Sequence, residues 1–374
     1  MKYKLGEICE IVSGSTPKTS VAEYWDGDIK WITPAELTDE SYIIEDSVRK
    51  LTELGVKKSG LTPFPAGTVI LSSRAPIGKV AIAGCEMYCN QGFKNLICSD
   101  KINNKYLYWF LKGNTAFLNS LGRGATFKEI SKGIVSDIEI NVPDAESQNR
   151  AVSNLEKLSE IMKLRKNEIS ELDNLIKARF GELFDGKYPE DTLLNLCNII
   201  DYRGKTPEKV ESGLPFITAK NVKMHHMTLE PREYISKETY DKVMVRGFPK
   251  EGDVVFTTEA PLGNVCKIPH FDTEFYIGQR IVTMQTDTLN PTYLEYALSD
   301  EEFIRKYMGK SSGSTVTGIR VRLLEQLTIP VPPRALQDEF SIFVNQVDKS
   351  KAAVQKSLDE TQVLFDSLMQ KYFG

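Results

Sequence analysis

Two short polar stretches of this 374-residue chain come close to motifs that act on nucleotides or nucleic acids. The stretch NPTY at 290–293 resembles the Asn/Asp-Pro-Pro-aromatic segment with which DNA methyltransferases hold a flipped base, but it lacks the second proline. Its counterpart at 103–106 reads NNKY, so we interpret Asn290-Pro291 as a helix start with proline near the first turn. Methyl transfer is therefore not expected in this chain.

The stretch MGKSSGST at 308–315 suggests a phosphate-binding loop, but Ile304 stands where that motif needs its first glycine. Paired acids such as Glu301-Glu302 are typical of a solvated helix face rather than of a nuclease. The six cysteines form no CxxC pair and only three histidines exist, so we expect buried free thiols in strands and no metal site.

The elements around these stretches occur twice. WITPAEL (31–37) resembles FITAKNV (216–222), RAPIGKV (74–80) resembles EAPLGNV (259–265), and ESQNRAV (146–152) resembles ALQDEFS (335–341). The spacing is 185 positions from Ala75 to Ala260 and 190 from Thr16 to Thr206, and the order of the matches is the same throughout. Such ordered similarity indicates an internal duplication.

Each copy predicts the same elements in the same order. Apolar runs broken by Gly and Pro, such as TVILSSR and DVVFTTE, predict strands, and NKYLYWFLKG and PTYLEYALSD predict short helices. A Gly/Ser/Thr loop and a last strand ending at Val-Pro follow in each copy. In the repeated Ala-Pro-x-Gly segment we expect turn geometry, because Pro fixes φ and Gly permits a positive φ.

Each copy ends in a long helix with a narrow apolar seam. Its residues recur at steps of three, four and seven: Leu155, Leu158, Met162, Ile169, Leu172, Ile176 and Leu183, then Phe340, Phe343, Val347, Val354, Leu364 and Leu368. A single seam needs a partner, so we expect the two helices to pair antiparallel about a pseudo-twofold axis; the alternative is that each packs only on its own domain. The fold class predicted is α+β, with globular domains at 1–145 and 185–334 and helices at 146–184 and 335–374.

The charges of the N-terminal stretch argue against a secretory signal, and no stretch approaches ~20 apolar residues, so we expect a cytoplasmic protein without membrane contact. The net charge is −4, and residues 1–142 carry 17 Lys+Arg against 16 Asp+Glu. Residues 185–332 carry 18 against 21. Bulk charge therefore does not predict general nucleic-acid binding, although local basic loops remain compatible with it.

The duplicated signatures resemble the specificity subunit of type I restriction–modification enzymes. The resemblance covers the whole chain and rests on LGEIC and LLNLC, SGSTP and RGKTP, APIG and APLG, NQGF and IGQR, the Val-Pro ends followed by Gln148 and Gln337, and the terminal helices. It implies that each globular domain is a target recognition domain for one half of a split double-stranded DNA sequence. It also implies that the helices set the spacing and dock two modification (methyltransferase) subunits.

The same resemblance implies that catalysis lies elsewhere. The chain itself would hold no cofactor, whereas S-adenosylmethionine, ATP and Mg²⁺ are expected on the partner modification subunits and on restriction motor-nuclease subunits. Phosphate contacts would then come largely from partners, so we expect the chain alone to bind DNA weakly. Two other readings stay open: a coiled-coil scaffold that recognises protein, and a self-sufficient methyltransferase.

If the chain reads DNA, Arg, Lys, Asn, Gln, Ser and Thr in its loops are the side chains suited to base edges and phosphates. In the first copy the candidates are Ser73, Arg74, Lys79, Asn90, Gln91, Lys94, Arg123, Thr126 and Lys128. In the second they are Lys220, Asn221, Thr258, Asn264, Gln279, Arg280, Ser314, Thr315, Arg320 and Arg322. Gln91 and Gln279 occur in both copies, which favours a shared fold role or backbone contact. Positions that differ between the two copies, such as Arg74 in the first and Glu259 in the second, are better candidates for discriminating between DNA sequences.

Overall fold

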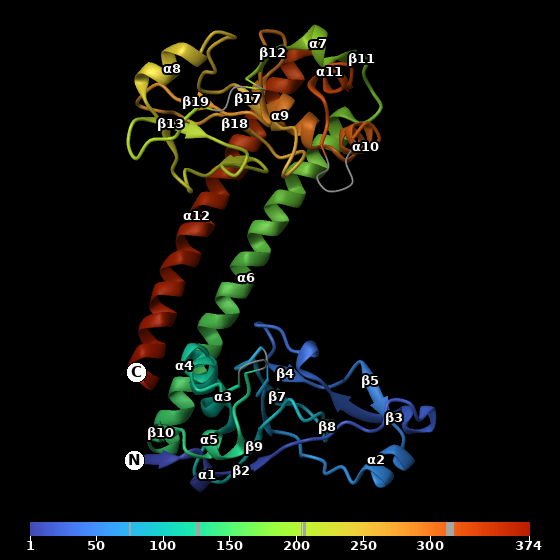
Figure 1. The fold of residues 1–374 in the computed structure, drawn as a ribbon, viewed down its shortest axis with the longest axis vertical. Helices are drawn as coiled ribbons and strands as arrows, with labels where there is room; N and C mark the ends of the chain where they lie inside the picture. The colour runs from blue at the N-terminus through green and yellow to red at the C-terminus, as the bar shows by residue number, and fades with distance from the viewer. Residues whose placement is uncertain (75, 125–127, 203, 205–206, 312–317) are drawn as a thin grey trace. The chain divides into compact units, whose positions relative to one another are not determined.

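A computed structural model describes residues 1–74, 76–124, 128–202, 204, 207–311 and 318–374. The chain forms two compact units (Figure 1): unit 1 comprises residues 1–166 and 356–374, and unit 2 comprises residues 167–355. Each unit takes one part of helix α6 (Ala145–Phe184) and one part of helix α12 (Arg334–Phe373). Within the described ranges, no helix is both long and apolar enough to span a membrane.

Unit 1 is a mixed unit of short strands and helices. Its strands are β1 (Lys2–Lys4), β2 (Cys9–Val12), β3 (Trp25–Ile32), β4 (Ile43–Ile44), β5 (Arg49–Leu51), β6 (Val69–Leu71), β7 (Val80–Ala83), β8 (Tyr88–Cys89), β9 (Asn95–Cys98) and β10 (Glu139–Asn141). Its shorter helices are α1 (Leu5–Ile8), α2 (Glu53–Ser59), α3 (Asn104–Gly113), α4 (Thr115–Ser120) and α5 (Lys132–Ser136), with 3₁₀ turns η1 (Ala22–Tyr24) and η2 (Pro34–Glu36). The main sheet has the order β2-β9-β6-β7-β4.

Unit 2 repeats this plan. Its strands are β11 (Glu190–Thr192), β12 (Asn198–Asp201), β13 (Leu214–Ile217), β14 (Val222–Lys223), β15 (His226–Met227), β16 (Tyr234–Ile235), β17 (Val254–Thr257), β18 (Val265–Lys267), β19 (Tyr276–Ile277), β20 (Ile281–Gln285) and β21 (Thr328–Pro330). Its shorter helices are α7 (Leu193–Leu196), α8 (Lys237–Val243), α9 (Pro291–Ser299), α10 (Glu301–Met308) and α11 (Val321–Leu324). The sheet β12-β20-β17-β18 matches β2-β9-β6-β7 strand for strand, as the duplication predicts.

The interior strands β6 and β17 are buried at every position because both of their faces are covered. In β6, Val69 and Leu71 point into the larger core of unit 1, whereas Ile70 points into a second core on the opposite face. In β17, Val254 and Phe256 likewise lie in one core and Val255 in another. These strands therefore provide a fixed base for the loops at their ends.

The predicted helix start at Asn290 is confirmed. The Asn290 side chain caps α9 by accepting a hydrogen bond from the Thr292 N–H at 2.9 Å, and Pro291 occupies the first turn. Asn103 caps α3 in the same way through the Lys105 N–H at 2.8 Å. NPTY thus has a structural explanation in the duplicated fold.

A buried glutamine joins each long helix to its unit. The Gln148 side chain, 3% exposed, accepts from the Asn103 N–H at 2.8 Å and donates to the Pro143 carbonyl at 3.0 Å. Gln337, 1% exposed, makes the equivalent bonds to the Asn290 N–H and the Pro332 carbonyl, each at 2.8 Å. These matching hydrogen bonds show that Gln148 and Gln337 are equivalent residues of the two copies, which are offset here by 189 positions.

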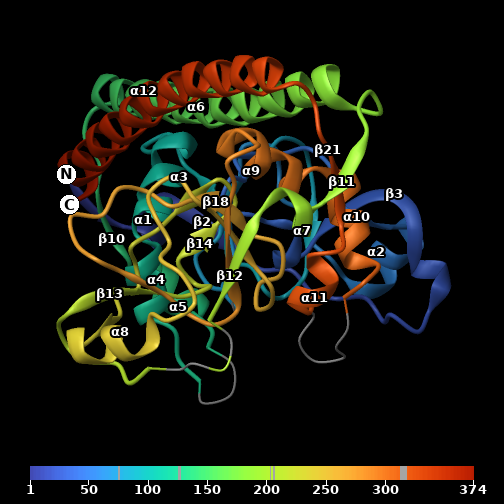
Figure 2. The same cartoon turned by 90° about the horizontal axis from the view of Figure 1, so that it is seen from above.

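The long helices pack antiparallel within each unit, as the apolar seams predict, and Figures 1 and 2 both draw them side by side. In unit 1, Asn154 donates to the Tyr372 hydroxyl at 3.0 Å and Arg165 donates to Thr361. In unit 2, Arg179 contacts Glu339 at 2.8 Å and Lys351 contacts Asp173. In both pairs of contacts one residue number rises as the other falls, which is the antiparallel direction.

One predicted seam position is wrong. Leu364 is 50% exposed, whereas Leu358 and Thr361 are buried and Phe365 packs against the core of unit 1. The seam here follows residues 358, 361, 365 and 368, and Leu364 lies about 100° away from Phe365 around the helix. An apolar side chain one residue off the seam therefore faces solvent.

Candidate nucleic-acid interface

Several of the residues predicted to contact DNA lie together where β6 ends in unit 1. The chain leaves this strand through Ser73, whose N–H donates to the Gly92 carbonyl at 2.7 Å and whose carbonyl accepts from the Ile130 N–H at 3.0 Å. Arg74 follows directly and is exposed. The buried strand thus delivers an arginine to the surface between two other segments of the unit.

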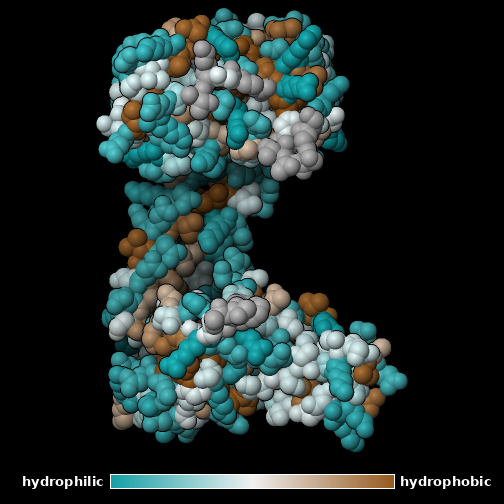
Figure 3. All heavy atoms as spheres, in the orientation of Figure 1, coloured by the Kyte–Doolittle hydropathy of each residue, from teal (hydrophilic) through white to brown (hydrophobic). Residues whose placement is uncertain are grey.

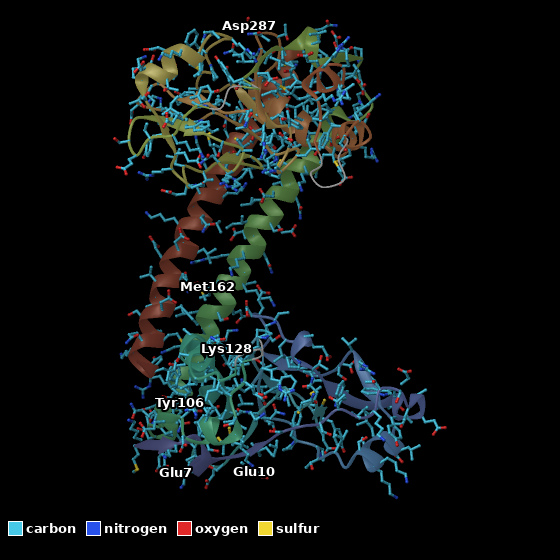
Figure 4. The ribbon with its side chains drawn as sticks, in the orientation of Figure 1. Glu7, Glu10, Tyr106, Lys128, Met162 and Asp287 are labelled. Atoms are coloured by element: carbon cyan, nitrogen blue, oxygen red, sulfur yellow. The ribbon has the colours of Figure 1, made fainter. Side chains whose placement is uncertain are left out.

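The loop at 121–130 is closed by a pair of backbone bonds. Arg123 and Glu129 exchange both N–H···O bonds, each at 3.0 Å. Arg123 and Lys128 are exposed on this loop, and Figure 4 labels Lys128 in unit 1. Three exposed cationic residues, Arg74, Arg123 and Lys128, therefore belong to one strand end and the loop paired with it.

Glu129 is the carboxylate that holds this cluster. Arg74 Nε donates to Glu129 Oε2 at 2.9 Å, and Lys94 Nζ donates to Glu129 Oε1 at 3.2 Å. Lys94 is only 7% exposed and also donates to the Ser73 hydroxyl at 3.3 Å. One carboxylate thus orients one exposed and one buried cation.

The surroundings of Glu129 keep it ionised. Burial by itself raises the pKa of this carboxyl, but hydrogen bonds and charges from Arg74 and Lys94 outweigh burial and leave the pKa below its ordinary value. Opposite charges within hydrogen-bond distance favour the charged form of a carboxyl. The ion pair is therefore formed at neutral pH.

Unit 2 has the same backbone arrangement at the end of β17. Thr258 donates its N–H to the Arg280 carbonyl at 2.8 Å and accepts from the Ile319 N–H at 2.9 Å, which are the bonds made by Ser73 in unit 1. The next residue is Glu259, and Arg280 Nε lies 3.1 Å from Glu259 Oε1. Arg280 is exposed and has a φ of 75°.

Both units therefore carry an arginine–carboxylate pair at this strand end, but the strand-end residue is the arginine in one unit and the carboxylate in the other. The strand-end residue is the arginine in unit 1, Arg74, and the carboxylate in unit 2, Glu259. The partner comes from the 121–130 loop in unit 1 and from the segment before β20 in unit 2. Such a difference on a common backbone is what two readers of different sequences would need.

The repeated turn after each strand is confirmed as turn geometry. Gly78 and Gly263 have φ angles of 91° and 94°, and their N–H groups donate to the carbonyls of Ser72 and Thr257 at 3.0 and 2.9 Å. Both φ values lie in the region that favours glycine. Ala75, in the first of these turns, lies outside the described residues.

The structure separates the predicted readers by exposure. Exposed are Arg74, Gln91, Arg123, Lys128, Lys220, Arg280, Arg320 and Arg322, and half-buried are Lys79, Asn90, Asn264 and Gln279. Buried are Ser73, Lys94, Asn221 and Thr258. Thr126, Ser314 and Thr315 lie outside the described residues. Exposure allows the first group to reach DNA without rearrangement of the core.

Several of the less exposed candidates have partners inside the protein. Asn221 accepts from the Thr218 N–H at 2.9 Å and donates to two loop carbonyls, each at 3.1 Å. Asn264 donates to the Val222 carbonyl at 2.8 Å, Lys79 donates to the Leu37 carbonyl, and Asn90 accepts from Gly92 at 2.9 Å. These side chains shape the loops that carry the exposed residues.

The shared glutamine of the first copy also has a partner within its unit. Thr16, in the repeated Thr-Pro segment, donates its hydroxyl to Gln91 Oε1 at 2.6 Å. This contact favours the fold role predicted for the repeated glutamines. Thr206, which corresponds to Thr16 in the second copy, lies outside the described residues.

Glu129 is the residue of this site that sequence reasoning missed. It is an acid, whereas the candidates predicted from the sequence are all cationic or neutral polar side chains. A signal existed, since Glu129 pairs with the strand-end residue Arg74 and its backbone counterpart Gly318 bridges to the strand-end residue Glu259. Each of these two backbone pairs therefore contains one carboxylate: Glu129 opposite Arg74 in unit 1, and Glu259 opposite Gly318 in unit 2.

Among the described residues, no group of histidine, cysteine and acidic side chains is arranged to hold a metal ion. The six cysteines are free thiols, and Cys9, Cys89, Cys197 and Cys266 are buried. The two strand ends thus present both hydrogen-bond donors and acceptors, Arg74 with Glu129 and Arg280 with Glu259.

Comparison with known proteins agrees with this description. The family model for the type I restriction modification DNA specificity domain matches residues 1–174 and again residues 190–361. Together these two matches include both strand-end sites and most of both long helices. The duplication inferred from the sequence is thus also a duplication of a family domain.

Similar proteins cover nearly the whole chain. The MjaIX specificity subunit of a type I restriction enzyme from Methanocaldococcus jannaschii is 27% identical over 98% of this chain and 91% of its own length. The MjaVIII specificity subunit of the same organism is 22% identical over 95% of this chain and 89% of its own length.

Solved structures show the same fold. The S subunit of a type I restriction–modification system from M. genitalium has a TM-score of 0.59 at 15% identity and covers 100% of this chain and 96% of its own. A chain solved in work on complex assembly and conformational transition of the type I R-M system has a TM-score of 0.62 at 20% identity, covering 100% of this chain and 97% of its own. With both halves matched by one model, the chain belongs to the family of type I restriction modification DNA specificity domains.

Proposed function

We propose that this chain is the non-catalytic DNA-recognition and assembly subunit of a type I restriction–modification complex. Unit 1 reads one half of a bipartite double-stranded target and unit 2 reads the other. The observation that carries the proposal is an arginine–carboxylate pair at the same strand end of both units, in which the strand-end residue is Arg74 in unit 1 and Glu259 in unit 2. It lies within two matches to a DNA specificity domain.

In unit 1 the reading surface is centred on Arg74. A guanidinium offers two parallel donors, which suit O6 and N7 of guanine in the major groove. Arg123 and Lys128 lie on the loop beside it and suit backbone phosphates. Because Arg74 is already bonded to Glu129, it is oriented before DNA arrives.

In unit 2 the strand-end residue is the carboxylate Glu259, where unit 1 has Arg74. Glu259 suits the N4 amino group of cytosine as an acceptor, while Arg280 offers the donors that Arg74 offers in unit 1. The same backbone thus presents two different hydrogen-bonding patterns. Further candidates of this unit for base or phosphate contact are the exposed Lys220, Arg320 and Arg322 and the half-buried Gln279.

The long helices supply docking surfaces for two modification subunits. Leu175 in unit 2 is 49% exposed and Leu364 in unit 1 is 50% exposed, and they occupy equivalent positions of the duplicated helix at the 189-position offset. Ile161 and Leu164 add apolar area in unit 1. Figure 3 shows hydrophobic residues among hydrophilic ones on the visible surface of the helices.

Equivalent surfaces on equivalent helices suit two copies of the same partner. An exposed apolar patch on a helix that already has a packing partner is a surface for a further protein. The partner modification subunits carry S-adenosylmethionine and adenine methylation, and motor-nuclease subunits carry ATP, Mg²⁺ and cleavage. The complex works in the cytoplasm.

Sequencing that detects methylated bases tests this proposal directly. The chain is expressed with its modification subunit in a host that lacks other DNA methylation, and the genome is sequenced. The expected result is methylated adenine in a split motif with a fixed spacer. Methylation at a continuous motif, or methylation unchanged when this chain is left out, would overturn the proposal.

A second arm assigns each half of the motif to one unit. The Arg74→Ala chain is expected to change the motif in one half, and the Arg280→Ala chain in the other. Lys132→Ala, an exposed cation in α5 outside the cluster, serves as the control and should leave the motif unchanged.

A further inference from the structure

Two cysteines face each other across the main sheet of unit 1. Cys9 begins β2 and Cys98 ends β9, and the antiparallel register makes them direct partners. The Ser99 N–H donates to the Ile8 carbonyl at 2.9 Å. The hydrogen bond between the strands is thus made by the residues flanking the two cysteines and not by the cysteines themselves. Such a pair is a non-hydrogen-bonded pair, the kind with closer Cα atoms, about 4.5 Å apart.

This spacing is compatible with a disulfide. Bridged cysteines have Cα atoms about 4.4–6.8 Å apart, and side chains of directly opposed residues point to the same face. Cys9 is 7% exposed in the core of unit 1, and the half-buried Cys98 packs against that core. The neighbouring Cys98 thiol and burial both raise the pKa of the Cys9 thiol.

We propose that Cys9 and Cys98 form a dithiol modification site in unit 1, at which a small-molecule disulfide such as oxidised glutathione introduces a cross-strand disulfide. The half-buried Cys98 is the entry point because it is the less buried residue of the two. Cys9, buried behind it, is the resolving thiol. The product ties the edge strand β2 to β9 covalently.

The chemistry is thiol–disulfide exchange in two steps. Cys98 loses its proton to solvent, and its thiolate attacks one sulfur of the small disulfide, forming a mixed disulfide and expelling one small thiolate. Cys9 then loses its proton and attacks the Cys98 sulfur, which forms the Cys9–Cys98 bond and expels the second thiolate. Two protein thiols and one small disulfide become one protein disulfide and two small thiols, and two electrons pass to the small molecule.

The site belongs to unit 1 alone, although the fold is duplicated. Cys197 occupies the place of Cys9, following α7 as Cys9 follows α1, with the same φ of −137°. Extending the β12–β20 register by one residue beyond Asn198 and Gln285 puts Thr286 opposite Cys197. Unit 2 therefore has the first thiol of the site and a hydroxyl in place of the second.

The consequence for unit 1 is a fixed sheet edge. β9 begins directly after Lys94, the buried cation that holds Glu129 in the candidate reading site. A bridge between β2 and β9 suppresses opening of this edge in unit 1 and leaves unit 2 as it was.

The test uses the full chain, reduced and then equilibrated with mixtures of oxidised and reduced glutathione. Free thiols are counted after denaturation and crosslinked peptides are identified by mass spectrometry. The expected result is the loss of two of the six free thiols, one intrachain Cys9–Cys98 peptide, and recovery with dithiothreitol. Hydrogen exchange should slow in β2 and β9 and stay unchanged in β12 and β20.

Matched variants make the test specific. Cys98→Ser should abolish the crosslink, and Thr286→Cys should create a second one, to Cys197. Six titratable thiols after oxidation, a glutathione adduct at Cys98 that never proceeds to the crosslink, or bridges between separate chains would each overturn the assignment. The crosslink in the unaltered chain is decisive whether or not the variants fold.

Discussion

Arg74 donates to Glu129 across 2.9 Å and thereby joins the end of β6 to a loop 55 residues further along the chain. The pair fixes an exposed guanidinium on a buried strand without burying the charge, because the side chains keep 45% and 34% of their surface. At the end of β17 in unit 2, a different arginine–carboxylate contact joins Arg280 to Glu259. An oriented but accessible arginine in each unit leads to the first prediction.

Arg74→Ala is expected to weaken recognition of one half-site only. Loss of a bidentate base contact costs about 1–3 kcal/mol, which is roughly 5- to 150-fold in affinity. The measurement is binding of the assembled methyltransferase to duplexes in which one half-site at a time is replaced. Arg280→Ala should give the mirror-image result, and an equal loss at both half-sites in either variant would contradict the assignment.

Glu129→Gln is expected to lower stability at neutral pH and to have a vanishing effect in acid. Hydrogen bonds from Arg74 and Lys94 outweigh burial and lower the pKa of Glu129 from its ordinary value of 4.5. A carboxyl with a lowered folded pKa stabilises the protein above its unfolded pKa, and this contribution disappears as the pH falls through the folded pKa. Urea unfolding should show a difference of about 1 kcal/mol at pH 7, typical of a partly exposed ion pair. A difference that grows below pH 4 would refute the sign.

Gln148→Met is expected to destabilise unit 1 by about 2–3 kcal/mol. The substitution keeps the volume of the side chain but removes the partner of the Asn103 N–H and of the Pro143 and Lys101 carbonyls, and an unsatisfied buried group costs about 1–3 kcal/mol. Hydrogen exchange should rise in β1, β10 and α3 and remain unchanged in unit 2. Gln337→Met should reverse the pattern, and a uniform loss across both units would argue against local joints.

Leu364→Asp is expected to weaken binding of one modification subunit while leaving the fold of unit 1 intact. The side chain is half exposed, so a charge there costs little in the isolated chain but opposes burial at an interface. Native mass spectrometry should detect complexes that carry one modification subunit instead of two, and Leu175→Asp should act likewise. Asn174→Asp, on the exposed residue beside Leu175, is the control and should retain both subunits.

An insertion of four residues between Met162 and Ile169 is expected to lengthen the spacer of the DNA target and to leave both half-site sequences unchanged. Four residues add about 6 Å of helix, or roughly two base pairs if fully transmitted. A four-residue stutter is partly absorbed by unwinding of the coiled coil, so one base pair is the lower expectation. An active variant with its original spacer would show that the helices do not set the distance.

Much of the fold follows from patterns in the sequence that report burial. The strands β6 and β17 were predictable because an uninterrupted apolar run between Gly and Pro has few alternatives, and α9 because Asn290-Pro291 caps a helix in both copies. The helix seam was predictable for the same reason, except at Leu364. At that point Leu364 and Phe365 are adjacent and both apolar, so the sequence pattern allows either one to lie on the seam. Packing against the core of unit 1 selects Phe365.

The site was less predictable because residue type does not report whether a polar side chain is already occupied. Asn221 and Lys94 have the chemistry of DNA readers, yet both are buried with partners inside the protein. Glu129 has the opposite chemistry and still belongs to the cluster, because it comes within bonding distance of Arg74 only after the loop folds back. Contacts between residues 55 positions apart carry no local signature.

Each long helix is divided between the two units, and as a result the units are not completed in the order in which their synthesis begins. Unit 2 is one uninterrupted stretch, residues 167–355, whereas unit 1 needs residues 356–374, in which Tyr372 and Phe373 contact Asn154 and Tyr106. At ~5–20 residues per second, a ribosome takes roughly 10–40 s to make the intervening stretch. During that interval the nascent first unit has its sheet but an uncovered core face. The unit that begins first is therefore completed last, and the exposed face of its nascent form is where a chaperone would be needed.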